Sequence, residues 1–389
     1  MKYYDILIRT ANSAIKEIES KSFFVGGNNG PRNQKETPVR KVSHWLVVFC
    51  KLYKKTSNKK YSKFAVILKD YLMSKKSRPY GYTFYHRDFS NGDSCNGVIG
   101  QAWTLEALIW YYDTFKDVDV RILINKIIEF HSFDKKLGIW NRMDINGSKK
   151  RGFDTTLNHQ IMFAGVLALG ASFNAINNSN QVQIFLDRLK NNIELHTNGR
   201  FKMRINKYNM LKNLRIINFI RLTKTYSFFR RLLLFDKKYL IKARELEKNE
   251  KEIEIGYHAF HQYGLSYLYK FNPSHEIWDN KKIKKALLYS LSKDYIDDVF
   301  KNKYGYGYNP PGIEISFIIE TFNNFLVKNS LEKKSFIELN VKKLLKKQML
   351  LTFDFSKSLM NINEYDKITY SSRIYEMCYI SENILNSTY

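Results

Sequence analysis

Apolar residues recur at helical spacing along almost the whole chain, whereas the alternation typical of β-strands is scarce. The pattern predicts twelve helices, at residues 3–19, 38–55, 61–74, 98–115, 118–131, 155–174, 179–194, 256–271, 279–293, 312–328, 334–349 and 369–386. Joined by alternating loops, these helices form six helical hairpins. The longest apolar run, from Ile161 to Ala171, is shorter than the ~20 residues that cross a bilayer, so we expect no transmembrane helix.

Every second helix follows a polar segment, and five of the six segments contain Gly or Pro. These helices begin at 38, 98, 155, 256, 312 and 369, at intervals of 60, 57, 101, 56 and 57 residues. Four of the five intervals agree closely, which indicates a structural period. The spacing predicts an all-α fold, an α/α toroid of six hairpins or (α/α)6 barrel, formed by a single domain over 1–389. The even helices would form an inner ring and all begin at one rim. An open helical solenoid is the alternative, but six hairpins are the number that closes a ring.

The long interval contains an insertion at 198–251. From Lys202 to Arg244 the chain has thirteen Lys or Arg and one acidic residue, Asp236, with aromatic and aliphatic residues between them. This pattern is typical of a helix lying on an anionic membrane surface, so 204–244 is a candidate membrane contact. The candidate contact residues are Arg215, Arg221, Phe228, Phe229, Arg230 and Arg231. Packing on the outside of the toroid and polyanion binding are the alternatives.

The formal charge of the 389-residue chain is +27, from 64 Lys and Arg against 37 Asp and Glu. The excess lies in Lys, in a chain also rich in Asn, Ile, Tyr and Phe, as AT-rich genomes encode, so charge alone does not indicate a polyanion partner. RNP strands, zinc fingers and basic heptad regions are absent, and we expect no nucleic-acid partner.

Three cysteines, Cys50, Cys95 and Cys378, cannot form a disulfide framework, and no CxxC pair suggests zinc. The N-terminus has no apolar signal-peptide region. We therefore expect a cytoplasmic protein without metal or cofactor, which the basic insertion would attach to the inner membrane face.

The segment RGFDTTLNHQIMFAG holds the most informative polar residues. Asp154 precedes a helix whose first turns carry Asn158 and His159. A carboxylate, an amide and an imidazole at one helix mouth can protonate a leaving group, orient water and hold a sugar hydroxyl. The alternative is an ordinary Asp N-cap with a polar first turn.

Two further segments supply candidate ligands of a sugar. In CNGVIGQAWTLEAL, Asn96 is a predicted N-cap and Gln101 and Trp103 follow on the first turns; Trp103 offers a flat plate for stacking on a sugar ring. In YGYNPPGIEIS, Tyr308 and Asn309 precede a helix.

Charged residues and histidines also gather at the predicted mouths. We expect one of His258 and His261 to face the lumen and the other to pack; without an HExxH motif the pair does not indicate zinc. Glu314 lies just inside its helix. Arg40 and Arg373 suit an acidic group on a ligand.

Several of these strings resemble one known family. GPRNQKETPVRKVSHW, CNGVIGQAWTLEAL, FDTTLNHQIMFAG, GYHAFHQYG and GYNPPGIEIS are similar to the Agl-cluster Q-type proteins of archaeal N-glycan and bacterial surface-polysaccharide assembly. The resemblance covers nearly the whole chain except the insertion at 198–251. It implies a six-hairpin glycosidase fold, in agreement with the toroid predicted from spacing.

Two enzyme classes of that superfamily suggest different chemistry. FDTTLNHQIMFAG is similar to the inner-helix motif of unsaturated glucuronyl hydrolases, which implies acid–base roles for Asp154 and Asn158. Their second catalytic Asp has no clear counterpart, and Asn96 stands near its expected place. N-acylglucosamine epimerases resemble this chain in placing histidines at inner-helix starts, which implies proton exchange between His159 and His258 on opposite faces of a sugar.

The sequence thus predicts a carbohydrate-active enzyme acting on a uronic or otherwise anionic sugar of a surface polysaccharide or lipid-linked glycan. In hydrolase or lyase chemistry Asp154 would be the general acid–base group, assisted by Glu314 or His258. A sugar epimerase or isomerase and a non-catalytic glycan-binding toroid are the alternatives. The predicted substrate-binding residues are Arg40, His44, Asn96, Gln101, Trp103, Asn158, Tyr308, Asn309 and Arg373.

Overall fold

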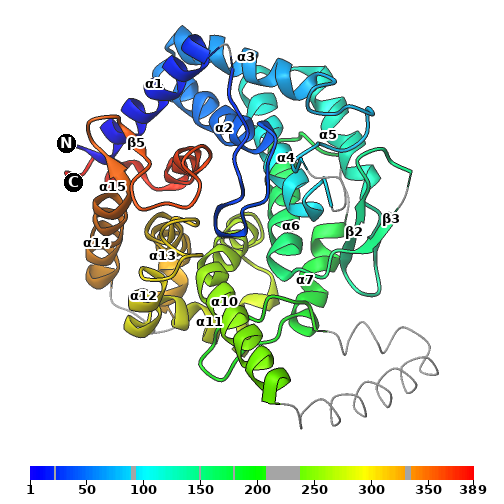
Figure 1. The fold of residues 1–389 in the computed structure, drawn as a ribbon, viewed down its shortest axis with the longest axis vertical. Coiled ribbons are helices and arrows are strands. Elements are labelled where there is room, and N and C mark those ends of the chain that lie inside the picture. Colours follow the sequence, from blue (N-terminus) through cyan, green and yellow to red (C-terminus); the bar gives the residue numbers. More distant parts are fainter. Residues whose placement is uncertain (22, 89–92, 149, 178–179, 207–236, 329–333) are drawn as a thin grey trace.

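Six helical segments stand around a central axis and form a closed ring (Figure 1). The computed structural model describes residues 1–389 except 22, 89–92, 149, 178–179, 207–236 and 329–333. The inner segments are α2 (Val39–Thr56), α4 (Gly97–Phe115), α6 (Leu157–Ser172), α10 (Lys237–Phe271), α13 (Pro311–Lys328) and the 3₁₀ helix η3 (Tyr370–Tyr379). Each packs on the next, and η3 contacts both α13 and α2.

A second layer of helices surrounds this ring. It consists of α1 (Tyr3–Lys21), α3 (Lys59–Met73), α5 (Val118–Phe130), α7 (Gln181–Asn192), α11 (Lys281–Leu291), α12 (Lys293–Val299) and α14 (Lys334–Thr352). Helices α4 and α6 are buried on nearly all sides, whereas α1, α3 and α5 bury one face only. A helix that is apolar all round belongs inside, and an amphipathic one covers it. The predicted (α/α)6 toroid is confirmed.

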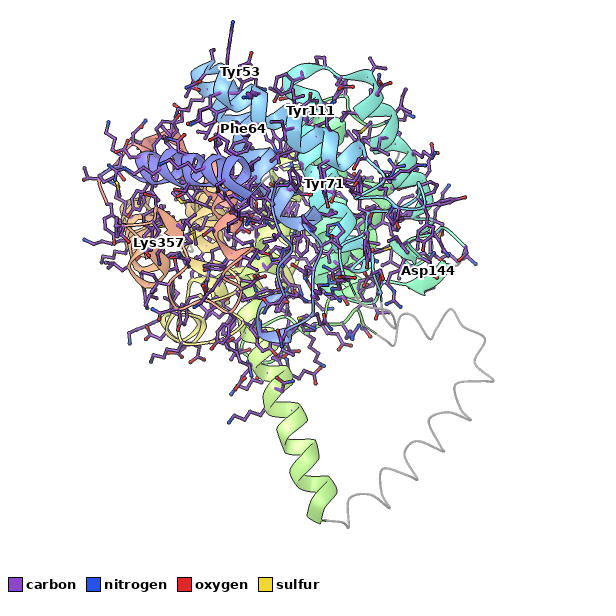
Figure 2. The ribbon with its side chains drawn as sticks, turned by 45° about the horizontal axis from the view of Figure 1, so that its top comes forward. Tyr53, Phe64, Tyr71, Tyr111, Asp144 and Lys357 are labelled. Atoms are coloured by element: carbon purple, nitrogen blue, oxygen red, sulfur yellow. The ribbon has the colours of Figure 1, made fainter. Side chains whose placement is uncertain are left out.

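Some elements differ from the prediction. The helix expected at 369–386 is η3 followed by the short α15 (Glu382–Leu385). The helix expected at 279–293 is divided into η2 (Glu276–Asp279), α11 and α12, because the Ser292 hydroxyl accepts a hydrogen bond from the Tyr295 amide at 3.2 Å and starts a new helix there. Helix α10 begins at Lys237, far before the expected residue 256, and its first turns extend beyond the ring (Figure 2).

Two small antiparallel sheets were not expected. The first joins β1 (Phe133–Asp134), β2 (Ile139–Met143) and β3 (Lys150–Phe153), and the second joins β4 (Phe353–Asp354) and β5 (Leu359–Met360). Strands of two to five residues are too short to give a period-two pattern. The first sheet leads into α6: Gln160 accepts a hydrogen bond from the Trp140 amide at 2.9 Å and donates to the Trp140 carbonyl at 2.8 Å.

The segment between α1 and α2 crosses the face of the ring (dark blue in Figure 1). It contains the short helix η1 (Gly30–Arg32), and a side chain at Gly30 would collide with the ring of Tyr308, 2.1 Å from its nearest atom. This segment therefore lies directly on the residues that precede α13.

Part of the insertion is described. Leu195 pairs with Phe201, and Arg204 with Thr156, so the chain lies along the start of α6 before residue 207. The candidate membrane residues Arg215, Arg221, Phe228, Phe229, Arg230 and Arg231 lie outside the described residues. Among the helices that are described, none is long and apolar enough to span a bilayer. The membrane contact stays a prediction.

Candidate active site at the mouth of the ring

A cavity of about 480 Å³ lies where the inner helices begin. Its wall includes residues that precede or start α2, α4, α6 and α13 and residues from the middle of α10, and it reaches η3. Nine of the predicted site residues line it: Arg40, Asn96, Trp103, Asp154, Asn158, His159, Tyr308, Asn309 and Arg373. The predicted common mouth thus brings together side chains from five inner segments.

Asp154 and His159 form a hydrogen-bonded pair in this wall. Asp154 Oδ2 lies 2.9 Å from His159 Nδ1 and accepts a hydrogen bond from the Val98 amide of α4 at 3.0 Å; Oδ1 accepts from the Thr156 amide at 3.1 Å. Burial favours the protonated acid, but His159 and the amides outweigh it and hold the pKa of Asp154 well below its usual range. Because an ionised carboxylate only accepts, Nδ1 carries a proton, and in the neutral imidazole Nε2 would then hold the free lone pair.

Gly97 makes this pairing possible. It has φ +59°, and a Cβ there would lie 2.2 Å from Asp154 Oδ2 and 2.7 Å from His159 Nδ1. Asp154 does not cap its own helix, α6, which begins after Thr156. Its carboxylate instead caps the start of α4, where it accepts the hydrogen bond from the Val98 amide. The pair lies against a helix N-terminus, where the positive end of the dipole stabilises the carboxylate.

Asp93 is a site residue that sequence reasoning missed. It lines the cavity, and its Oδ2 accepts a hydrogen bond from the Gly97 amide at 2.8 Å. The adjacent Val98 amide binds Asp154, so two carboxylates meet at the start of α4. Its position three residues before Asn96, in the polar segment NGDSCNG, was the available signal.

Arg40, Trp103 and Tyr308 form an aromatic and basic part of the wall. The Arg40 guanidinium carbon lies 4.4 Å from the Trp103 ring centroid and 5.6 Å from that of Tyr308, within cation–π distance. Arg40 NH1 lies 3.4 Å from both carboxylate oxygens of Glu36. One face of Trp103 is thus covered by Arg40, and the rings of His44 and His86 also lie near it, so that Trp103 is only 5% exposed.

Arg373 is held by its own neighbours. Its Nε donates to Glu376 Oε1 at 2.6 Å, NH1 to Asn309 Oδ1 at 3.0 Å and NH2 to Glu314 Oε1 at 2.9 Å. Burial raises the pKa of Glu376 to about 7 and that of Glu314 well above its usual range, against the opposing effect of Arg373. Glu314 lies behind Arg373 and does not line the cavity.

The structure corrects the expectation that His258 or His261 faces the lumen, because neither lines the cavity. His258 is fully buried against α11: Nδ1 accepts from the Phe201 amide at 3.3 Å, and Nε2 lies 3.0 Å from Ser290 Oγ. Burial lowers the pKa of His258 well below its usual range. His261 Nδ1 lies 2.7 Å from the Tyr257 carbonyl.

Two predicted ligands also lie away from the cavity. Gln101 is fully buried, accepts a hydrogen bond from the Phe84 amide at 2.9 Å and donates to the Phe84 carbonyl at 3.1 Å, so it fixes the loop before α4. His44 stacks on Tyr375, with 4.4 Å between ring centroids, and lies 3.1 Å from Ser372 Oγ. Gln101 therefore fixes a loop to α4, and His44 joins α2 to η3.

Four more arginines line the cavity: Arg32, Arg87, Arg142 and Arg204. Arg87, Arg142 and Arg204 were not selected from the sequence, because each lies in a loop or short strand whose fold could not be inferred. Across the described residues, no group of three or more His, Cys, Asp or Glu side chains could hold a metal ion.

Comparisons with known proteins agree with this architecture. The chain is 31% identical over 372 residues to archaeal glycosylation protein Q of Haloferax volcanii, covering 96% of this chain and 95% of that protein. No family model matches. In structure it is similar to D-mannose isomerase, with a TM-score of 0.63 and 12% identity over 97% of this chain and 95% of that one. It is also similar to cellobiose 2-epimerase of Bacillus thermoamylovorans B4167, with a TM-score of 0.58 and 8% identity over 95% and 98%. Both belong to the six-hairpin glycosidase superfamily.

Proposed function

Because the chain belongs to the family of archaeal glycosylation protein Q, we propose that it is an enzyme that processes a sugar during glycan assembly, with His159 as its acid–base group. The observation that carries the proposal is the Asp154–His159 pair in the wall of the cavity. Support also comes from the shared fold with a sugar isomerase and a sugar epimerase.

The geometry favours proton transfer between neighbouring carbons. His159 Nε2 removes a proton from a carbon next to a carbonyl, and the C–H electron pair passes to the carbonyl oxygen to form an enediolate. Return of that proton to the former carbonyl carbon, with transfer of the neighbouring hydroxyl's proton to the enediolate oxygen, moves the carbonyl by one carbon and completes an isomerisation. Asp154 keeps the imidazole oriented and stabilises the imidazolium, as a carboxylate does for a catalytic histidine.

One base on one face suits this reaction better than a two-histidine epimerisation. His258, the expected second histidine, is buried against α11 and hydrogen-bonded there. Epimerisation at a single carbon would need another proton donor on the opposite face.

Hydrolysis or elimination at a uronic sugar is a second candidate, favoured by Asp93. Asp93 and Asp154 accept hydrogen bonds from successive amides at the start of α4. Most glycosidases use a pair of carboxyl groups as their catalytic residues. Of the general acid–base role predicted from sequence for Asp154, its lowered pKa suits the part of a base or nucleophile and not that of an acid.

Incubation with aldoses, ketoses, uronic acids and uronate disaccharides in D₂O, followed by NMR, tests the proposal. We expect deuterium at a carbon beside the carbonyl with glycosidic bonds intact. His159→Gln should lower the rate about 10²–10⁴-fold, the usual contribution of a general base. His275→Gln, outside the cavity, is the control.

Other outcomes decide against proton transfer by His159. If the protein cleaves a disaccharide, and this cleavage activity remains in His159→Gln but is lost in Asp93→Asn, the second candidate is supported. Sugar binding without any turnover would leave a glycan-binding toroid and overturn the proposal.

A further inference from the structure

The rim of the cavity carries arginines from four separate segments. Arg32 ends η1, Arg87 precedes α4, Arg142 belongs to β2, and Arg204 follows α7 and pairs with the start of α6. All four line the same cavity. Such convergence of distant segments differs from a solvated charge run along one helix.

Three of these arginines form no ion pair with a carboxylate among the described residues, although Arg87 acts electrostatically on the neighbouring Glu36. Arg32 lies over the Tyr257 ring, with its guanidinium carbon 5.7 Å from the centroid. Arg204 NH1 donates to two threonine hydroxyls, at 3.2 and 3.3 Å. The Nε of Arg87 is buried without a hydrogen-bond partner in that part of the chain. Arg142 NH1 lies 3.8 Å from Asp93 Oδ2.

The deeper arginines differ from those of the rim. Arg40 is paired with Glu36, and Arg373 with Glu314 and Glu376. The deep arginines are therefore neutralised by their own carboxylates, whereas the four rim arginines outnumber Asp93 and Glu250, the less buried carboxylates of the lining, and keep an excess of positive charge there. A concave surface focuses such a field and attracts anions.

We propose that the rim arginines bind a phosphate group, so that the substrate is a phosphorylated sugar whose ring reaches His159. The inference rests on the proposed function and names its substrate class. A planar carboxylate is satisfied by one bidentate arginine, whereas guanidinium groups arriving from several directions suit a tetrahedral phosphate or a diphosphate. The cavity volume of about 480 Å³ admits a sugar together with such a group.

The direct test is calorimetric titration of the full chain with inorganic pyrophosphate and, separately, with glucuronate. Arg87→Gln and Arg204→Gln remove one rim charge each, and Arg121→Gln removes an exposed arginine of α5 as the matched control. We expect 1:1 binding of pyrophosphate that weakens about tenfold or more in each rim variant, as for loss of a charge-assisted hydrogen bond. Binding should also weaken with added salt.

Two results would overturn the inference. The first is equal pyrophosphate affinity in the rim variants and in Arg121→Gln. The second is tighter binding of glucuronate than of pyrophosphate, with loss of glucuronate affinity in the rim variants, which would assign the rim to a carboxylate.

Competition against pyrophosphate separates the sources of the phosphate. A sugar 1-phosphate, a uridine diphosphate hexose and a short-chain polyprenyl diphosphate sugar are compared, and displacement by any of them through the rim arginines supports the site. Because binding is measured without turnover, the two proposals can fail separately. If pyrophosphate binds but no sugar reacts, only the proposed enzymatic activity is refuted. If phosphate-free sugars react but pyrophosphate does not bind, only the proposed phosphate site is refuted.

Discussion

Replacing Gly97 by alanine tests the close approach on which the Asp154–His159 pair depends. A Cβ at residue 97 would lie 2.2 Å from Asp154 Oδ2 and 2.7 Å from His159 Nδ1, so the pair must move away from α4. Gly81 is a matched control, because its φ is also positive, at +73°, but nothing lies within 4 Å of the added atom.

The two substitutions should differ in stability because only the methyl group at residue 97 disturbs a hydrogen bond. Both place alanine in the left-handed region, which costs about 1–2 kcal/mol. Gly97→Ala also displaces the Asp154 carboxylate from the Val98 amide, and a hydrogen bond to a charged group contributes about 1.5–3 kcal/mol. We therefore expect a loss of about 1–2 kcal/mol for Gly81→Ala and roughly 2.5–5 kcal/mol for Gly97→Ala.

Urea unfolding at pH 7, followed by circular dichroism, measures the free energy of unfolding of both variants. The rate of deuterium incorporation into the sugar measures the effect on chemistry. Displacement of a catalytic group by about 1 Å can cost 10²-fold in rate, so Gly97→Ala should lose activity while folded and Gly81→Ala should keep it. Equal stability and equal activity of the two variants would refute the argument that Gly97 accommodates the pair.

Three further predictions concern groups whose charge or burial is unusual. Because folding lowers the pKa of Asp154, the ionised carboxylate stabilises the folded state above about pH 4, and this stabilisation is lost as the pH falls further. The free energy of unfolding of the wild type should therefore fall more steeply with decreasing pH than that of Asp154→Asn. Arg373→Met should lower the free energy of unfolding by about 3–5 kcal/mol, because Glu314 and Glu376 remain buried without a cation. Changing Glu314 and Glu376 to Gln in the same variant should restore part of this free energy in urea unfolding. No recovery would contradict the ion-pair account. His258→Asn should lower stability but leave the deuterium-exchange activity of the folded protein intact, and loss of activity without loss of stability would return this histidine to the reaction.

The sequence identified the mouth because two patterns coincided there. The repeated interval indicated the ring, and the polar segments before every second helix separated the inner helices from the outer ones. Asp154, Asn158 and His159 lie within six residues of one another, so local spacing was enough to place them together.

The direction in which each side chain points was decided by the tertiary structure. Tyr257 and Phe260, three residues apart on α10, line the cavity, whereas His258 points toward α11. One residue along a helix is a rotation of 100°, and a helix buried on all sides carries no polar stripe that fixes this rotation.

The chain by itself therefore determined the ring, its period and the common mouth, because helical periodicity is a local property of the sequence. Only the folded structure decided that Gly97 meets Asp154, that Asp93 and Asp154 bind successive amides of α4, that His258 packs against α11, and that arginines of four segments share one rim. These contacts depend on packing between residues far apart in sequence, where helix rotation and loop path are set by neighbours that no local pattern records.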